Sequence, residues 1–195
     1  MTVRIYLAGP EVFLPDAVAA GEAKKAVCAR HGATGVFPLE PIACPEADAA
    51  PDRWYDIYLR NEAHIRSCDA LVANLTPFRG PSADAGTVYE LGLMRGLGRP
   101  IAGHTNVAAP FDARTRAFLG PSLGRRGEEE VDAEGLSLEA FGLVDNLMLD
   151  GGVRAAGGIV AVRDVPAADR WTDLAGFEEA VRAVVAAVRG SPPAP

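Results

Sequence analysis

The stretch VRIYLAGP, Val3–Pro10, decides the fold that this sequence predicts. Its first six residues form a nearly continuous apolar run, which is typical of a strand buried on both faces of a parallel sheet. Gly9 and Pro10 then end the run. Four later stretches are expected to be the remaining strands: 34–39, 69–75, 99–104 and 157–162.

Segments of helical character alternate with these strands. We expect helices over 15–31, 52–67, 86–98 and 173–189. Strands that alternate with helices favour a parallel sheet that is covered on both faces. The prediction is therefore an α/β fold, a flavodoxin-like (Rossmann-like) doubly wound sheet of five parallel strands with helices on both faces.

The sequence shows no internal repeat and no second domain, so we expect a single domain over 1–189 and a disordered tail over 190–195. The proline-rich stretch 38–51 predicts a long loop of the kind that often serves a site. The stretch 104–150 is less regular and is interpreted as an elaboration of the same domain. Within it, Arg125–Glu130 is expected to be a solvated loop.

Composition and charge argue against several classes of protein. The 195 residues carry a net charge of −7, and a nucleic acid polymer demands a basic surface. No apolar run approaches the ~20 residues of a membrane span, and no secretory signal is visible. Three widely spaced cysteines fit reduced thiols. We expect a cytoplasmic protein that binds neither membrane nor nucleic acid polymer, while a nucleoside or nucleotide stays open as a ligand.

The predicted sheet indicates where a ligand would bind. In open parallel sheets, ligands lie beyond the carboxyl ends of the strands, at the point where the strand order reverses. In a flavodoxin-like order that point lies between the first and third strands, whose ends fall in 6–13 and 74–87. Both stretches are rich in Gly and Pro. Gly9 and Gly86 are candidate binding residues because glycine lets a ligand approach the backbone closely.

Two acids mark the start of the predicted helix 86–98. Asp84 is well placed to cap this helix by accepting hydrogen bonds from its first amides, and capping alone would explain it. Glu90 lies about one turn further along, beside the buried spacing of Val88, Leu91 and Met94. Two interpretations of Glu90 stay open: a solvated helix glutamate, or a carboxylate held ionised in a dry crevice as a nucleophile.

Asn61 and Tyr6 are the other polar candidates. Asn61 interrupts an apolar stripe on the predicted helix 52–67, and a buried amide must find hydrogen-bond partners in the protein or in a ligand. The stripe consists of Trp54, Ile57, Ile65 and Cys68. Two interpretations of Tyr6 stay open: it packs within the sheet with its hydroxyl in solvent, or its hydroxyl reaches the crevice. The three histidines have no metal-ligand spacing, and no dinucleotide or triphosphate fingerprint occurs.

Three pieces of the sequence, in order, resemble the nucleoside 2-deoxyribosyltransferase family. They are IYLAGPEVF, NEAHIRSCDALVANLTPFRGPSADAGTVYELG and FGLVDNLML. The resemblance runs from residue 4 to about residue 153. Its most specific element is the pattern D-x-G-T-x-x-E-x-G, which begins at Asp84.

The resemblance implies an enzyme that cleaves the N-glycosidic bond of a 2′-deoxynucleoside and passes the deoxyribosyl group to another purine or pyrimidine base. By this likeness Glu90 attacks C1′ and forms a covalent intermediate, with retained configuration after the second displacement. Tyr6 orients Glu90. Asp84 contacts the base and helps to shuttle its proton, a general-acid role typically worth about 10²–10⁴-fold in rate. The family needs no metal or organic cofactor.

The resemblance also implies binding roles. Asn61 stands where some members have an aspartate, so an amide here orients the base or Asp84 and delivers no proton. Phe13 matches an aromatic residue that stacks on the base. Asn146 and Met148 resemble a pair that a neighbouring subunit inserts to bind the sugar 5′-hydroxyl, which implies a homo-oligomer. A segment that packs in its own core explains Asn146 equally well.

Two other functions stay open. One is an N-glycosidase of nucleosides or nucleoside 5′-monophosphates, in which water replaces the acceptor base; an acid, Glu11, in the first turn argues against a phosphate. The other is a non-catalytic nucleotide-binding sensor on the same fold. The intact set of Tyr6, Asp84 and Glu90 argues against the sensor, because a sensor needs no nucleophile.

Overall fold

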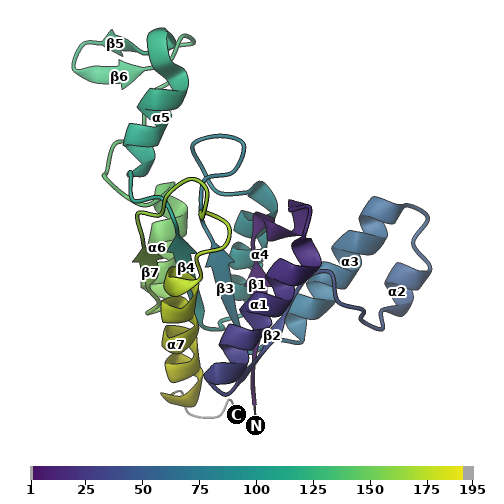
Figure 1. The fold of residues 1–195 in the computed structure, drawn as a ribbon. Coiled ribbons are helices and arrows are strands. Elements are labelled where there is room, and N and C mark those ends of the chain that lie inside the picture. Colours follow the sequence, from purple (N-terminus) through teal and green to yellow (C-terminus); the bar gives the residue numbers. More distant parts are fainter. Residues whose placement is uncertain (1, 191–195) are drawn as a thin grey trace.

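The computed structural model describes residues 2–190, and its centre is a sheet of five parallel strands (Figure 1). The strand order is β2-β1-β3-β4-β7, with Tyr6 of β1 paired between Val36 of β2 and Leu71 of β3. The strands are β1 (Val3–Ala8), β2 (Ala33–Val36), β3 (Ala70–Asn74), β4 (Ile101–Thr105) and β7 (Val160–Val162). The predicted flavodoxin-like order is confirmed, with the reversal between β1 and β3.

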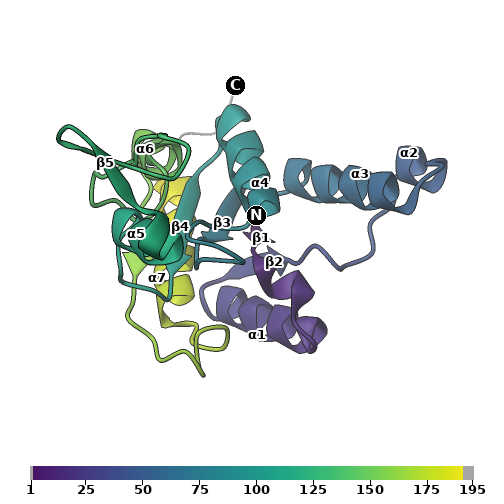
Figure 2. The same cartoon turned by 90° about the horizontal axis from the view of Figure 1, so that it is seen from above.

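Helices cover both faces of the sheet, as Figure 2 shows from above. On one face lie α1 (Ala17–Arg30) and α7 (Ala175–Gly190). On the other lie α3 (Arg53–Arg66), α4 (Ala85–Gly96) and α6 (Leu147–Ala155). Alternation along β1 divides the core accordingly, because Ile5 and Leu7 pack with α1 and α7 whereas Tyr6 and Ala8 face the other helices.

Helix α7 extends one residue into the stretch that was predicted to be a tail, since it ends at Gly190. Its buried side chains follow the 3.6-residue period that seats a helix on a sheet. They include Phe177, Ala180, Val181, Val184 and Val185. The rest of the predicted tail, 191–195, lies outside the described residues.

The stretch 104–150 contains more regular structure than its sequence indicates. It forms α5 (Phe111–Leu119), the 3-10 turn η2 (Gly120–Ser122) and a hairpin of β5 (Gly124–Arg126) and β6 (Glu129–Val131). The expectation of a loop at Arg125–Glu130 is therefore wrong, although these side chains are largely exposed as expected. Gly127, at φ 65°, supplies the left-handed residue of the turn. Helix α5 and the hairpin project from the sheet beyond its carboxyl edge (Figure 1).

The long loop 38–51 also holds a helical turn, α2 (Pro45–Asp48), and the turn after β1 is a 3-10 helix, η1 (Pro10–Phe13). In both, a proline stands in the first turn, where its missing N–H costs no hydrogen bond.

Helix α3 departs from its predicted burial. Trp54 and Ile57 are 69% and 49% exposed, and only the end of the stripe, Ile65 and Cys68, reaches the core. Figure 2 shows that the first turns of α3 extend beyond the sheet, so the start of the apolar stripe does not pack on the sheet.

A buried ion pair supports the turn after β1. Glu11 and Lys24 are both almost fully buried and contact each other, and Asn74 Nδ2 donates to Glu11 Oε1 over 2.8 Å. The acid therefore points into the protein, with its charge matched by Lys24. Glu11 is not presented to solvent, and the expectation that it disfavours a substrate phosphate stays a prediction.

We predict that Lys24→Met lowers the free energy of unfolding by about 3–5 kcal/mol, because it leaves the Glu11 charge buried and unpaired. The double variant Lys24→Met/Glu11→Gln should recover most of this loss. As a control, Arg126→Met breaks the exposed pair with Glu129 and should cost at most about 1 kcal/mol. Urea unfolding measures all three; a Lys24→Met protein as stable as the control would contradict the prediction.

Candidate active site

The centre of the site is a hydrogen bond between β1 and α4. The Tyr6 phenol donates to Glu90 Oε1 over 2.6 Å. Tyr6 is fully buried and Glu90 is 9% exposed. The interpretation of Glu90 as a solvated helix residue is therefore wrong. The predicted stripe beside it is confirmed for Leu91 and Met94, whose burial turns this side of α4 towards the sheet.

Burial dominates the electrostatics of this pair. It raises the pKa of Glu90 to about 7, the Tyr6 hydrogen bond opposes that rise, and the charge of Asp84 adds to it. Burial and the neighbouring Glu90 also raise the pKa of Tyr6, so the phenol keeps its proton and acts as the donor. Near neutral pH, Glu90 can therefore exist as a carboxylate with one hydrogen-bond donor in place.

Asp84 caps α4, as predicted. Its Oδ2 accepts from the Thr87 amide over 3.0 Å and from Thr87 Oγ1 over 3.2 Å. Gly86 makes room for this arrangement, because a Cβ there would lie 3.0 Å from Asp84 Oδ2. The cap and Glu90 thus share one helix, with the cap near the carboxyl edge of the sheet.

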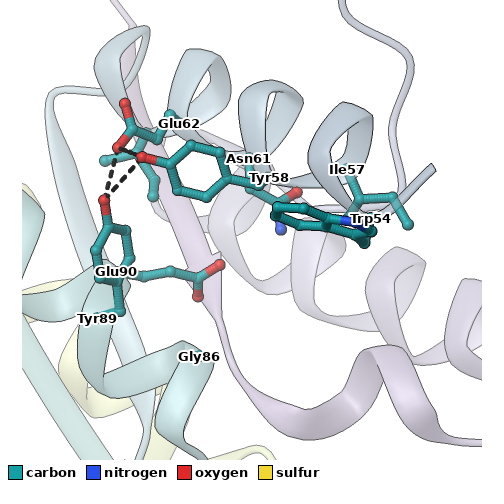
Figure 3. A pocket seen from close by; sticks show the side chains of 9 residues that line it. Trp54, Ile57, Tyr58, Asn61, Glu62, Gly86, Tyr89 and Glu90 are labelled. Atoms are coloured by element: carbon teal, nitrogen blue, oxygen red, sulfur yellow. Dashed lines mark hydrogen bonds between the residues drawn. The ribbon is translucent and has the colours of Figure 1, made fainter. Parts of the chain in front are cut away.

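A cavity of about 310 Å³ opens between α3 and α4, and Glu90 points into it (Figure 3). This volume is at the small end of the range for ligand pockets. Asn61 lies on its α3 wall and Gly86 on its α4 wall. The complete lining is Trp54, Ile57, Tyr58, Asn61, Glu62, Ile65, Gly86, Tyr89 and Glu90.

One part of the wall was missed by the sequence analysis. The phenols of Tyr58 and Tyr89 both donate to Glu62 Oε1, over 2.6 and 2.7 Å (Figure 3). These hydrogen bonds lower the pKa of Glu62, with Tyr58 contributing most. The four-residue spacing of Tyr58 and Glu62 is a signal that could have found half of this cluster. The cluster fixes two aromatic side chains beside the nucleophile candidate.

Phe13 and Gly9 follow β1 and do not line this cavity. The Phe13 ring stacks on Phe78 at 5.3 Å between centroids and is 56% exposed. The Arg79 guanidinium lies over both rings. Gly9 has an internal reason to be glycine, because a Cβ there would overlap the Glu11 carboxylate.

Asn146 and Met148 lie at the start of α6 and also fall outside the cavity of their own chain. Asn146 caps α6 by accepting from the Met148 amide over 3.1 Å, and its Nδ2 donates to Glu139 over 2.6 Å. Met148 is 72% exposed. The structure thus brings together Tyr6, Asp84, Glu90, Asn61 and Gly86, and leaves Asn146 and Met148 apart from them.

Two general features of residues 2–190 bear on ligands and location. No group of three or more His, Cys, Asp or Glu side chains in this range could hold a metal ion. No helix within it is long and apolar enough to cross a membrane.

Comparisons with known proteins identify a family and relatives of this chain. The family model described as nucleoside 2-deoxyribosyltransferase matches residues 5–148. An uncharacterized protein of Schizosaccharomyces pombe is 32% identical over 170 residues, which cover 81% of this chain and 80% of that protein.

Two solved structures share the fold. The 2-deoxyribosyltransferase from Leishmania mexicana is 30% identical, with a TM-score of 0.55 over 75% of this chain and 85% of that one. A conserved protein from Enterococcus faecalis is 20% identical, with a TM-score of 0.53 over 93% of this chain and 98% of that one. The second likeness shows the fold alone.

The raised pKa of Glu90 predicts a pH-dependent cost to stability. Because the folded-state pKa lies above the ordinary value of 4.5, the contribution of Glu90 is most favourable below pH 4.5 and declines as the pH rises to about 7. Glu90→Gln keeps an acceptor for Tyr6 and has no proton to lose. Its stability advantage over the wild type should be greater at pH 8 than at pH 5 by about 2–3 kcal/mol.

Urea unfolding at the two pH values measures this difference. Glu62→Gln is the matched control in the same cavity: the pKa of Glu62 is lowered, so its contribution is already complete above pH 4.5 and should not change between pH 5 and pH 8. An equal advantage of Glu90→Gln at both pH values would show that Glu90 titrates normally.

Proposed function

This chain belongs to the nucleoside 2-deoxyribosyltransferase family, and we propose that it transfers the 2-deoxyribosyl group of a 2′-deoxynucleoside to a second purine or pyrimidine base. The observation that carries the proposal is the buried Glu90 carboxylate, bonded to the Tyr6 phenol and facing the cavity between α3 and α4. The proposed reaction uses no metal or organic cofactor.

In the first step, a Glu90 oxygen attacks C1′ of the sugar. Tyr6 occupies Oε1, so Oε2 is the oxygen that we expect to attack. The C1′–N bond breaks and its electron pair goes to the leaving base. Asp84 helps to transfer to this base the proton that it takes up. The product is a glutamyl ester of deoxyribose.

In the second step, a nitrogen of the incoming base attacks C1′ and the ester bond to Glu90 breaks. The incoming base loses its proton towards Asp84, and the Glu90 carboxylate is restored. Two inversions at C1′ give net retention. Water in place of the base would give the N-glycosidase reaction, with free deoxyribose as the product.

The walls of the cavity support a planar base as the occupant. Trp54, Tyr58 and Tyr89 provide aromatic surface, and the Asn61 amide offers both a donor and an acceptor to base edges. We propose that Asn61 orients the base, and that the exposed face of Phe13 stacks on a base at the mouth of the crevice.

The sugar end of the site is proposed to come from a second copy of the chain. Asn146 and Met148 do not line their own cavity, and Met148 is exposed. We propose a homo-oligomer in which these two residues bind the sugar 5′-hydroxyl in the cavity of a neighbouring copy.

Incubation with deoxyinosine and adenine tests the reaction, and we expect deoxyadenosine to form. Glu90→Ala should lower transfer by about a thousandfold or more, because it removes the nucleophile, and should abolish the deoxyribosyl adduct seen by mass spectrometry of the wild type. Hypoxanthine and deoxyribose without deoxyadenosine would assign the chain to the hydrolases. A fully active Glu90→Ala protein would refute the role of Glu90.

Co-expression tests the shared site. Asn146→Ala and Glu90→Ala should each be nearly inactive alone. When the two variants are co-expressed in one oligomer, roughly a quarter of the sites pair an intact Glu90 with an intact Asn146, so activity should return. Chromatographic analysis of the mixed oligomer verifies that it forms; no return of activity in it would mean that Asn146 does not act across copies.

A further inference from the structure

We propose that Asp145 is a positioning residue that holds the proton-handling acid Asp84 and the sugar-binding Asn146 in place through one buried carboxylate. The proposal rests on the function proposed above. It concerns the long connection between β4 and α6, which the catalytic scheme otherwise uses only at its last residue, Asn146.

Asp145 is fully buried and accepts four hydrogen bonds. Its Oδ1 accepts from Ser82 Oγ over 2.5 Å and from the Asn146 amide over 2.8 Å. Its Oδ2 accepts from the Ala83 amide over 2.9 Å and from Arg114 Nη2 over 3.2 Å. A carboxylate has about four lone-pair positions, so the acceptor capacity of Asp145 is filled.

Arg114 completes the arrangement from α5. Its Nε donates to the Pro81 carbonyl and its Nη2 to the Val144 carbonyl, over 2.7 and 2.8 Å. The Arg114–Asp145 pair is nearly excluded from solvent, so each charge depends on the other for compensation. Together they join two segments that are more than 60 residues apart in the sequence.

The consequence for the active site follows from the chain order. The Ala83 amide that Asp145 binds belongs to the residue directly before Asp84, and Asp84 caps the helix that carries Glu90. On the other side, Asp145 binds the amide of Asn146 itself. A displaced Asp145 would therefore move Asp84 in its own site and Asn146, which serves the neighbouring copy.

This role has a chemical signature that a merely structural role lacks. A purine without a methyl group at N7 must gain a proton as it leaves, and Asp84 helps to transfer that proton. A purine methylated at N7 leaves as a neutral base and needs none. A change that acts through Asp84 should therefore slow deoxyguanosine but spare 7-methyl-2′-deoxyguanosine, whereas general loss of structure slows both.

The test compares kcat/KM for release of the base from these two nucleosides, with adenine as the acceptor of the deoxyribosyl group. Displacement of Asn146 slows both nucleosides alike, whereas displacement of Asp84 slows deoxyguanosine only. Asp145→Asn should therefore lose about tenfold or more in kcat/KM with deoxyguanosine relative to its loss with the N7-methyl form, and Asp84→Asn should show the same selectivity. Ser82→Ala removes one contact and should show a weaker effect in the same direction. Asp112→Asn is the matched control, because it breaks an α5 ion pair with Arg116 that touches neither Ser82 nor Ala83.

Hydrogen exchange gives a readout that does not depend on turnover. Peptides covering 82–87 and 146–149 should both exchange faster in Asp145→Asn, and neither should change in Asp112→Asn. If the wild type turns over neither nucleoside, the proposed function fails and exchange alone decides on Asp145.

Equal losses with both nucleosides, no loss, or unchanged exchange in either peptide would overturn the proposal. If Asp145→Asn does not fold, Ser82→Ala carries the same comparisons, since it leaves the Arg114–Asp145 pair intact.

Discussion

The hydrogen bond from Tyr6 to Glu90 joins the second strand of the sheet order to the helix that covers the point of strand reversal. It forms only if β1 presents Tyr6 to the α4 side, which requires the alternation of Ile5, Tyr6 and Leu7, and only if α4 starts at the Asp84 cap. The position of the Glu90 carboxylate therefore depends on strand register, helix capping and core packing together. Burial there works against the ionised form of Glu90, and the phenol offsets part of that effect.

Local patterns in the sequence predicted the framework well. The apolar runs of the strands gave the sheet, and Asp84 before a helix start gave the cap. Glu90 was ambiguous because a spacing of buried positions does not fix which neighbour is turned inward. Only the position of β1 beneath α4 settles its burial.

The features that were predicted wrongly or not at all have a common physical origin. Each depends on contacts outside its own segment of the chain. The stripe on α3 reads as buried from its period, but the helix runs past the sheet and leaves Trp54 exposed. The hairpin at 124–131 has few buried side chains and hence no strong apolar alternation. Asp145 carries no local signal, because its partners Ser82 and Ala83 are more than 60 residues away.

In the exposed part of α3, the shape of the cavity wall can change with little effect on the stability of the fold. Trp54 and Ile57 line the cavity yet contribute little to the core, so their replacement would change the shape of the binding wall at small cost in folding free energy. By contrast, Glu90 lines the cavity and is buried, and its hydrogen-bond partner Tyr6 belongs to the core. Under the proposed function, substitutions in the exposed part of α3 would alter which ligand is accepted and leave the chemistry at Glu90 unchanged.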